Sequence, residues 1–223
     1  MDVPAVSMRF PANPPVELPR DEPVPDGVTR IVQALLGSSS SLRSQTIAYD
    51  SKTQKLVVLL EDGLEWGRLA EICPDPEAAL AAEQDEFDRL PEEHPLHQRR
   101  IRGVSLVVDR PRSAPEAVDF ASRYFSPWNG IPEDPVNGSS HTVLGPFFAS
   151  LRRKEESMDN EHGSGGEGAV YRLRAAMASR RQGVLALQVH CRSDADGGGF
   201  SHIMLGGPAV LISDGTVHLP EEI

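Results

Sequence analysis

Short apolar runs separated by turn residues make up most of this chain, and their spacing predicts many strands and few helices. Val6–Phe10 alternates before Pro11, and Gly103–Asp109 is a nearly continuous apolar run, which is typical of a buried strand. We expect two further strands to pair around a turn at Asp50–Lys52. These two strands are Gln45–Ala48 and Lys55–Leu60. The strands expected elsewhere are Val118–Phe125, Val170–Leu173, Val184–Val189, His202–Leu205, Ala209–Ile212 and Val217–Leu219.

Helical spacing of apolar residues is confined to a few segments. Val28–Leu36 predicts a helix with Asp26 as its N-cap and Gly37 as its stop. Leu64–Ile72 predicts a short helix that two following prolines end. Two polar stretches are expected at the surface. Glu77–Leu90 predicts an acidic helix, and Pro91–Arg102 predicts an exposed connection.

The most apolar helix is expected at Ser139–Leu151. Its apolar residues recur at i, i+1, i+4, i+5 and i+8, namely Val143, Leu144, Phe147, Phe148 and Leu151. Gly145 and Pro146 interrupt this pattern and predict a kink. Because the segment is small and apolar and lies between strand-like flanks, we expect one curved sheet to surround it. The charged, glycine-rich residues 153–168 predict a flexible loop after it.

Composition narrows the functional classes. The chain has 223 residues with 33 acidic and 22 basic side chains, which gives a net charge of −11. This balance disfavours nucleic acids and anionic membranes as partners, because like charges repel. Cys73 and Cys191 stand far apart without a second thiol nearby, which fits a reduced, cytoplasmic protein better than a disulfide scaffold. We expect neither a signal peptide nor a membrane span, since no segment has either pattern.

Candidate chemistry is concentrated between Gly130 and His141, where Asp134 stands between two prolines just before the predicted helix. The first amides of a helix are unpaired and carry partial positive charge, so they can bind a carboxylate beside Asp134. The candidate substrate-binding residues are Gly138, Ser139, Ser140 and His141. A capped turn without any ligand is the alternative, and His141 can equally pack in the core. We expect no metal site, because His94 and His97, which lie in a polar loop, lack a carboxylate or thiol at ligand spacing.

Several motifs resemble those of the PhzF-like phenazine-biosynthesis isomerase family. The two central motifs are Phe120-x-x-Arg123-Tyr124-Phe125-x-Pro127 and Gly130-Ile131-x-Glu133-Asp134-Pro135-Val136-x-Gly138-Ser139-x-His141. Three further segments add to the likeness, namely Phe10-Pro11-Ala12, Ser179-x-Arg181-x-Gly183 and Gly206–Leu219. The resemblance therefore covers most of the chain.

The resemblance implies an α+β, diaminopimelate-epimerase-like fold, in which each of two similar halves is a curved, mostly antiparallel sheet around a central helix. It implies that the active site lies between the halves and that residues 1–223 form a single domain of the second, C-terminal type. Asp134 and Ser139 would then be catalytic residues facing the substrate. The family's Glu-Thr-x-Phe segment, which carries a catalytic glutamate, has no counterpart in these 223 residues.

Two hypotheses of different classes follow. In the first, the protein is an isomerase or epimerase-type enzyme that acts on a small carboxylate by a proton shift without a cofactor, the other half of its site coming from another chain or a longer gene product. In the second, it is a truncated, non-catalytic homologue that serves as a ligand-binding or interaction module. A proton shift needs an acid and a base, so we expect little or no turnover from this chain alone. An exposed half-interface would favour a homodimer.

Overall fold

A computed structural model describes residues 5–37, 42–82, 90–94, 96–97, 100–159, 168–192 and 199–209. Within this part of the chain, ten strands form one sheet in the order β1-β10-β9-β8-β6-β5-β4-β3-β2, and β7 also pairs with β6. The strands are β1 (Ala5–Pro11), β2 (Val16–Glu17), β3 (Ser44–Asp50), β4 (Lys55–Leu60), β5 (Gly103–Asp109), β6 (Phe120–Ser126), β7 (Ile131–Asp134), β8 (Val170–Met177), β9 (Gly183–Cys191) and β10 (Phe200–Pro208). Neighbouring strands are antiparallel except in the pairs β4–β5 and β6–β8.

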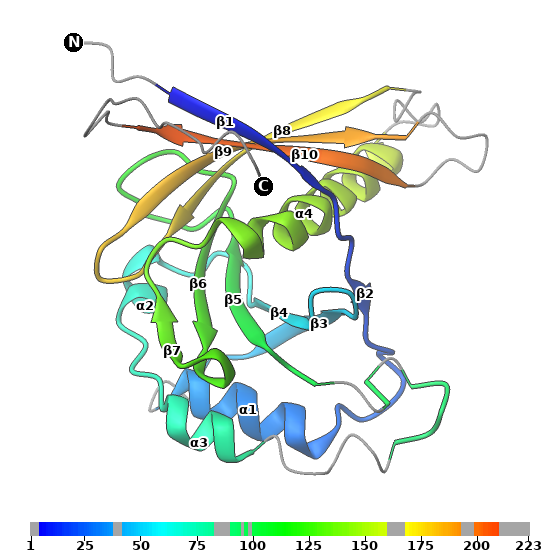
Figure 1. Cartoon of the computed structure of the whole chain (residues 1–223), viewed down its shortest axis with the longest axis vertical. Helices are drawn as coiled ribbons and strands as arrows, with labels where there is room; N and C mark the ends of the chain where they lie inside the picture. Colours follow the sequence, from blue (N-terminus) through cyan, green and yellow to red (C-terminus); the bar gives the residue numbers. More distant parts are fainter. Residues whose placement is uncertain are drawn as a thin grey trace, which may run out of the picture.

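The sheet curves around one long helix and carries three short helices on its other face (Figure 1). The enclosed helix is α4 (Gly138–Asp159), and the others are α1 (Asp26–Leu36), α2 (Trp66–Ala70) and α3 (Pro76–Ala81), with a 3-10 turn η2 (Pro127–Asn129). This arrangement confirms the expected α+β fold with a curved, mostly antiparallel sheet around a central helix. None of the described helices is long and apolar enough to cross a membrane.

Strands β4 and β5 are apolar along their length because both of their faces are covered. In β4, Leu56 and Val58 point into the core beneath α1, whereas Val57 and Leu59 point into the core around α4. Alternate residues of a strand face opposite sides of a sheet, so each of these strands contributes to both cores. The predicted bounds of Lys55–Leu60 and Gly103–Asp109 are confirmed for the same reason.

The enclosed helix packs closely against the strands around it. Val143, Leu144, Phe147 and Phe148 are buried, as expected from their spacing. A Cβ atom at Gly145 would lie 2.4 Å from Cδ1 of Ile203 in β10 and within 3.1 to 3.3 Å of two side chains of β9. The absence of a side chain at Gly145 therefore lets α4 approach these strands.

Pro146 leaves α4 continuous but frees one of its carbonyl groups. Because proline has no N–H, the carbonyl of Thr142, four residues earlier, lacks its usual helical donor. The backbone amide of Asn13 donates to this carbonyl at 3.0 Å, and the Asn13 side chain donates to Oγ1 of Thr142 at 3.0 Å. The proline thus creates an acceptor that docks the chain between β1 and β2 onto α4.

Several expected boundaries differ from the structure. The loop expected at residues 153–168 begins later, because α4 continues to Asp159. Arg152 pairs with Asp109 of β5, and the Arg153 guanidinium lies 5.0 Å from the ring centre of Phe200, so the charged residues of this turn have partners on the strands. Residues 160–167 lie outside the described part of the chain.

Other differences concern burial and strand length. The connection Pro91–Arg102 was expected to be exposed, but Leu96 and Ile101 are buried in the core beneath α1. The strand expected at Val118–Phe125 begins at Phe120 and is buried throughout, since it lies between both cores. Helix α2 is shorter than expected and α3 ends at Ala81. The strand expected at Val217–Leu219 and nearly all of that at Ala209–Ile212 lie outside the described residues.

Candidate active site

Asp134 lies at the end of β7, where it is held by the loop that follows it. It pairs across the sheet with Tyr124 of β6 and is half-buried. The amide of Val136 donates to Oδ1 of Asp134 at 3.3 Å, and Nδ2 of Asn137 donates to Oδ2 at 2.6 Å. Both carboxylate oxygens are therefore oriented by groups within three residues.

Asn137 is the N-terminal cap of α4. Its side-chain Oδ1 accepts hydrogen bonds from the amide of Ser140 at 2.5 Å and from the hydroxyl of Ser139 at 3.1 Å. The backbone amide of Asn137 donates to the sulfur of Met177 at 2.9 Å. A capping side chain satisfies one of the unpaired amides of a helix, so Asn137 both starts α4 and orients Asp134.

The expected anion-binding residues divide into two groups. Ser140 belongs to the cap, since its amide is bonded to Asn137 and its buried hydroxyl donates to the carbonyl of Asn137 at 3.2 Å. Gly138 and Ser139 are exposed, and the described residues give their two amides no hydrogen-bond partner. These two amides remain available to a ligand, whereas the single hydroxyl proton of Ser139 is donated to Asn137.

The side chain of Lys55, the first residue of β4, extends to the start of α4. Its Nζ donates to Oγ of Ser139 at 3.1 Å, and it lies 5.9 Å from the ring centre of Tyr124. The side chain is buried, and this burial lowers the pKa of Lys55 against a smaller, opposing effect of Asp50. Four side chains thus form a continuous run of hydrogen bonds, donated from Lys55 to Ser139 to Asn137 to Asp134.

His141 lies inside the core, one turn into α4. It is fully buried, its ring stacks on Phe120 with centroids 5.8 Å apart, and its Nδ1 lies 2.7 Å from the carbonyl oxygen of Asn137. Its Nε2 has no hydrogen-bond partner among the described residues. Burial lowers the pKa of His141 to about 4, so the ring is neutral at physiological pH. The structure places His141 beneath the expected binding residues, and its part in binding stays a prediction.

A buried ion pair fixes β7 from the other side. Arg123 of β6 donates through Nε and Nη2 to both carboxylate oxygens of Glu133, at 2.7 and 2.8 Å. Its Nη1 donates to the carbonyl of Ile72 at 2.6 Å. A bidentate pair of this kind has a defined geometry, so it positions Glu133 and, through it, the neighbouring Asp134.

The segment Ser179–Gly183 supports the same loop. The hydroxyl of Ser179 donates to the carbonyl of Pro135 at 2.7 Å. A Cβ atom at Gly183 would lie 2.6 Å from Cγ2 of Val136, so the glycine makes room for this side chain. The two motifs, far apart in sequence, therefore meet in the structure.

Lys55 and Asn137 are the residues of this cluster that were not among the candidate site residues. A lysine at the head of the strand Lys55–Leu60 reads as a strand boundary, and its contact with Ser139 spans 84 positions. A signal was present, because a lysine beside a run of five apolar residues is unusual for a strand buried on both faces. Among the described residues, no group of three or more His, Cys, Asp or Glu side chains could hold a metal ion.

Comparison with known proteins gives consistent results. A family model described as phenazine biosynthesis-like protein matches residues 4–215. Phenazine biosynthesis-like domain-containing protein 1 of Mus musculus is 30% identical over 191 residues, which cover 85% of this chain and 52% of the relative. An uncharacterized isomerase of Pseudomonas aeruginosa is 31% identical over 148 residues, which cover 66% of this chain and 43% of the relative. The chain thus spans about half the length of the curated relatives it matches.

Two solved structures have a similar fold. A crystal structure from the PhzF family of Enterococcus faecalis has a TM-score of 0.53 at 23% identity and covers 96% of this chain and 58% of that one. A PhzF-family protein of Bacillus anthracis has a TM-score of 0.57 at 16% identity, covering 96% of this chain and 61% of that one. At these identities the likeness concerns the fold.

Proposed function

The chain belongs to the phenazine biosynthesis-like family, and from this premise we propose that it forms one side of an isomerase-type site. This site binds a small carboxylate at the N-terminus of α4 and moves a proton without a cofactor. Relatives of this chain include two proteins named as uncharacterized isomerases, from Pseudomonas aeruginosa and Halalkalibacterium halodurans.

The run of hydrogen bonds between Asp134 and the start of α4 is the observation that carries this proposal. It holds the Asp134 carboxylate beside the exposed residues Gly138 and Ser139. The two unpaired amides lie at the positive end of a 22-residue helix, which favours a carboxylate ligand. A substrate carboxylate on these groups would bring its neighbouring carbon close to Asp134.

The residues then have separate roles. Asp134 is the group that takes or returns the proton, because a carboxylate in hydrogen-bond reach of a substrate can act as a general base or acid. Gly138 and Ser139 bind the substrate carboxylate through their two backbone amides. Ser140 and His141 lie behind them and support the cap of α4. The second acid–base group that a proton shift needs comes from another part of the protein or from another chain.

The test is solvent deuterium incorporation into small carboxylic acids, measured by mass spectrometry. Asp134→Asn is the matched variant, since it keeps the shape of the side chain and removes its basicity. We expect weak incorporation by the chain alone, because one of the two acid–base groups is absent, and none by the variant. Incorporation that is equal in both proteins would show that Asp134 does not move the proton.

A non-catalytic ligand-binding role is the second candidate. It is favoured by the fact that both oxygens of Asp134 already accept hydrogen bonds from Val136 and Asn137, as in a purely structural turn. Under this alternative the chain binds small carboxylates but incorporates no deuterium. Nuclear magnetic resonance titration of the Gly138 and Ser139 amides, run beside the exchange assay, separates the two candidates.

A further inference from the structure

We propose that the ammonium group of Lys55 is the counter-charge for the carboxylate that binds at the start of α4. The class of ligand rests on the proposed function, whereas the need for an anion follows from Lys55 itself. Lys55 would add an ammonium group to the two backbone amides that the ligand site already offers.

Lys55 is more deeply buried than a lysine ordinarily is. Only 8% of its surface is exposed, and it forms no ion pair with any carboxylate in the part of the chain that the structure describes. An ammonium has three protons to donate, and one hydrogen bond, to Ser139, is found among the described residues. A buried ammonium without an ion pair is unfavourable, so a bound anion would stabilise it.

The nearby Asp50 does not fill this need. Its carboxylate accepts hydrogen bonds from the amide of Thr53 at 2.8 Å and from the Thr53 hydroxyl at 2.5 Å, and it closes the turn between β3 and β4. It raises the pKa of Lys55 less than burial lowers it. Asp50 is the cross-strand partner of Lys55, but its carboxylate is bonded to Thr53 and forms no ion pair with the ammonium.

The surroundings hold Lys55 toward the exposed end of α4. Gly103 is its partner on β5, and a Cβ atom there would lie 2.0 Å from Oη of Tyr124, so the tyrosine ring extends across this position. The Tyr124 ring centre lies 5.9 Å from Nζ of Lys55. Oγ of Ser139, which is an exposed residue, lies 3.1 Å from the same Nζ. An anion bonded to the backbone amide of Ser139 would thus lie beside the residue that the ammonium contacts.

Binding of an anion should change the pKa of Lys55. The bound negative charge favours the protonated ammonium, so the pKa of Lys55, which burial lowers in the empty site, should rise when the ligand binds. The neighbouring His141 is kept neutral at physiological pH, because burial and, to a smaller extent, the Lys55 charge lower its pKa.

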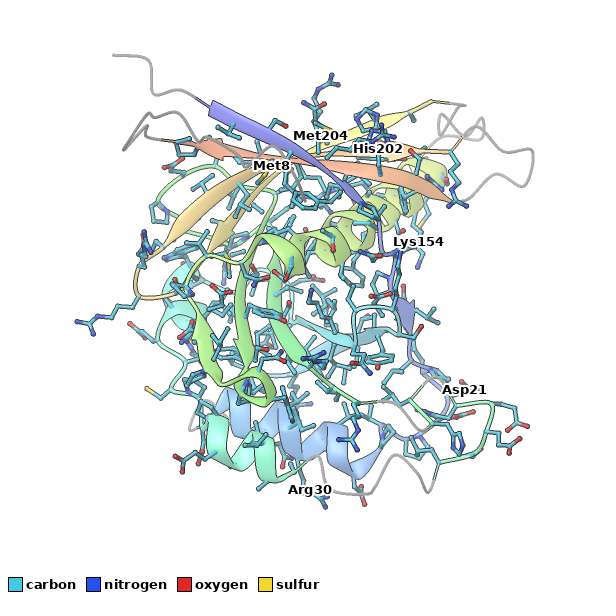
Figure 2. All side chains as sticks on the ribbon, in the orientation of Figure 1. Met8, Asp21, Arg30, Lys154, His202 and Met204 are labelled. Carbon is cyan, nitrogen blue, oxygen red and sulfur yellow. The ribbon has the colours of Figure 1, made fainter. Side chains whose placement is uncertain are left out.

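The experiment uses sulfate and acetate as probes and the amide signals of Gly138 and Ser139 as the readout, at constant ionic strength. Lys55→Met removes the ammonium and keeps a side chain of similar length. Lys154→Met is the matched control, since it removes the same charge from an exposed residue of α4 that pairs with Glu17 in β2 (Figure 2). We expect about 10- to 100-fold weaker binding in Lys55→Met and no change beyond about twofold in Lys154→Met.

Two outcomes would overturn the proposal. Binding by Lys55→Met that stays within a factor of about three of wild type excludes the ammonium as a ligand, since a charged hydrogen bond contributes more than that. Failure of both probes to shift the two amides in the wild-type chain excludes the anion site itself. If Lys55→Met does not fold, the side-chain pKa of Lys55 is measured in the wild-type chain with and without sulfate, and a pKa that does not rise contradicts the proposal.

The result is separable from the outcome for the proposed function. Anion binding that depends on Lys55 without any deuterium incorporation would remove the isomerase proposal and leave the role of the lysine in place. Deuterium incorporation that depends on Asp134 but not on Lys55 would leave the isomerase proposal in place and remove the role of the lysine.

Discussion

The carboxylate of Asp134 and the side-chain amide of Asn137 are joined by a hydrogen bond of 2.6 Å, donated by Nδ2. The same side chain accepts hydrogen bonds from Ser139 and Ser140 through Oδ1. Asn137 therefore connects the candidate acid–base group to the helix end that would hold the ligand. Its substitution should affect the stability of α4 and the arrangement of the site together.

Asn137→Ala is expected to lower the free energy of unfolding by about 1–2 kcal/mol, the usual cost of losing a helix cap. It should also weaken sulfate binding, because Ser139 and Asp134 lose the group that orients them. Asp75→Ala is the control, since Asp75 caps α3 through the amide of Ala78. It should lower stability by a similar amount and leave sulfate binding unchanged. Equal sulfate affinity in Asn137→Ala and wild type would show that Asn137 does not organise the site.

Arg123→Met is expected to destabilise the fold by about 2–4 kcal/mol, as measured by urea unfolding, because it leaves Glu133 without its partner. The exposed fraction of the Glu133 side chain is 23%, so the loss should fall below that of a fully buried pair. Arg174→Met removes an arginine that pairs with Glu116 at the surface and should cost less than about 1 kcal/mol. Similar losses in the two variants would contradict a special role for Arg123.

Gly145→Val is expected to lower the free energy of unfolding by about 1–3 kcal/mol, because the new side chain would collide with Ile203 and with β9. Gly67 of α2 has no atom within 4 Å of a Cβ placed on it and serves as the control. Gly67→Ala should be neutral or stabilising by up to about 1 kcal/mol, since alanine favours a helix. A Gly145→Val protein as stable as wild type would mean that β9 and β10 can move away from α4.

Local patterns predicted much of the fold, because the apolar spacing of a strand or helix reflects which of its faces is covered. The strand at Gly103–Asp109 and the buried positions of α4 follow from this rule. The extension of α4 beyond Leu151 did not, since its charged residues are stabilised by tertiary partners such as Asp109. Local sequence carries no record of such partners. The order of the strands, including the parallel pairing of β6 with β8, likewise depends on contacts between distant segments.

Only the part of the candidate site that lies on one loop, between Asp134 and Ser139, could be predicted from the sequence. Asp134, Gly138 and Ser139 are neighbours in sequence, and turn and helix-start chemistry brings them together. Lys55 joins them only because β4 and α4 meet in the folded protein. The role of Asn137 as the cap is visible in hindsight as an asparagine just before a helix, but its hydrogen bond to Asp134 depends on the turn geometry.

Stability should fall in mild acid because of His141. Its pKa in the folded protein is about 4, against 6.5 for the unperturbed side chain. The group is neutral in both states above pH 6.5, so it has no effect there. Between these two values the unfolded state binds a proton that the folded state does not, and the free energy of unfolding decreases as the pH falls. The total loss attributable to His141 should be about 3 kcal/mol, reached near the lower value.

The measurement is urea unfolding at a series of pH values on the wild type and on His141→Asn. Asparagine keeps a side-chain N–H that can donate to the carbonyl of Asn137, as Nδ1 of the histidine does, and it does not titrate. The variant should be less stable than wild type at neutral pH, because it leaves a cavity beside Phe120. The difference between the two proteins should shrink as the pH falls through the window, because only the wild type must exclude a proton from the core. Other titrating groups contribute equally to both proteins and cancel in this difference. Two parallel profiles would mean that the buried imidazole becomes protonated as easily in the folded as in the unfolded chain, which full burial beside Lys55 should prevent.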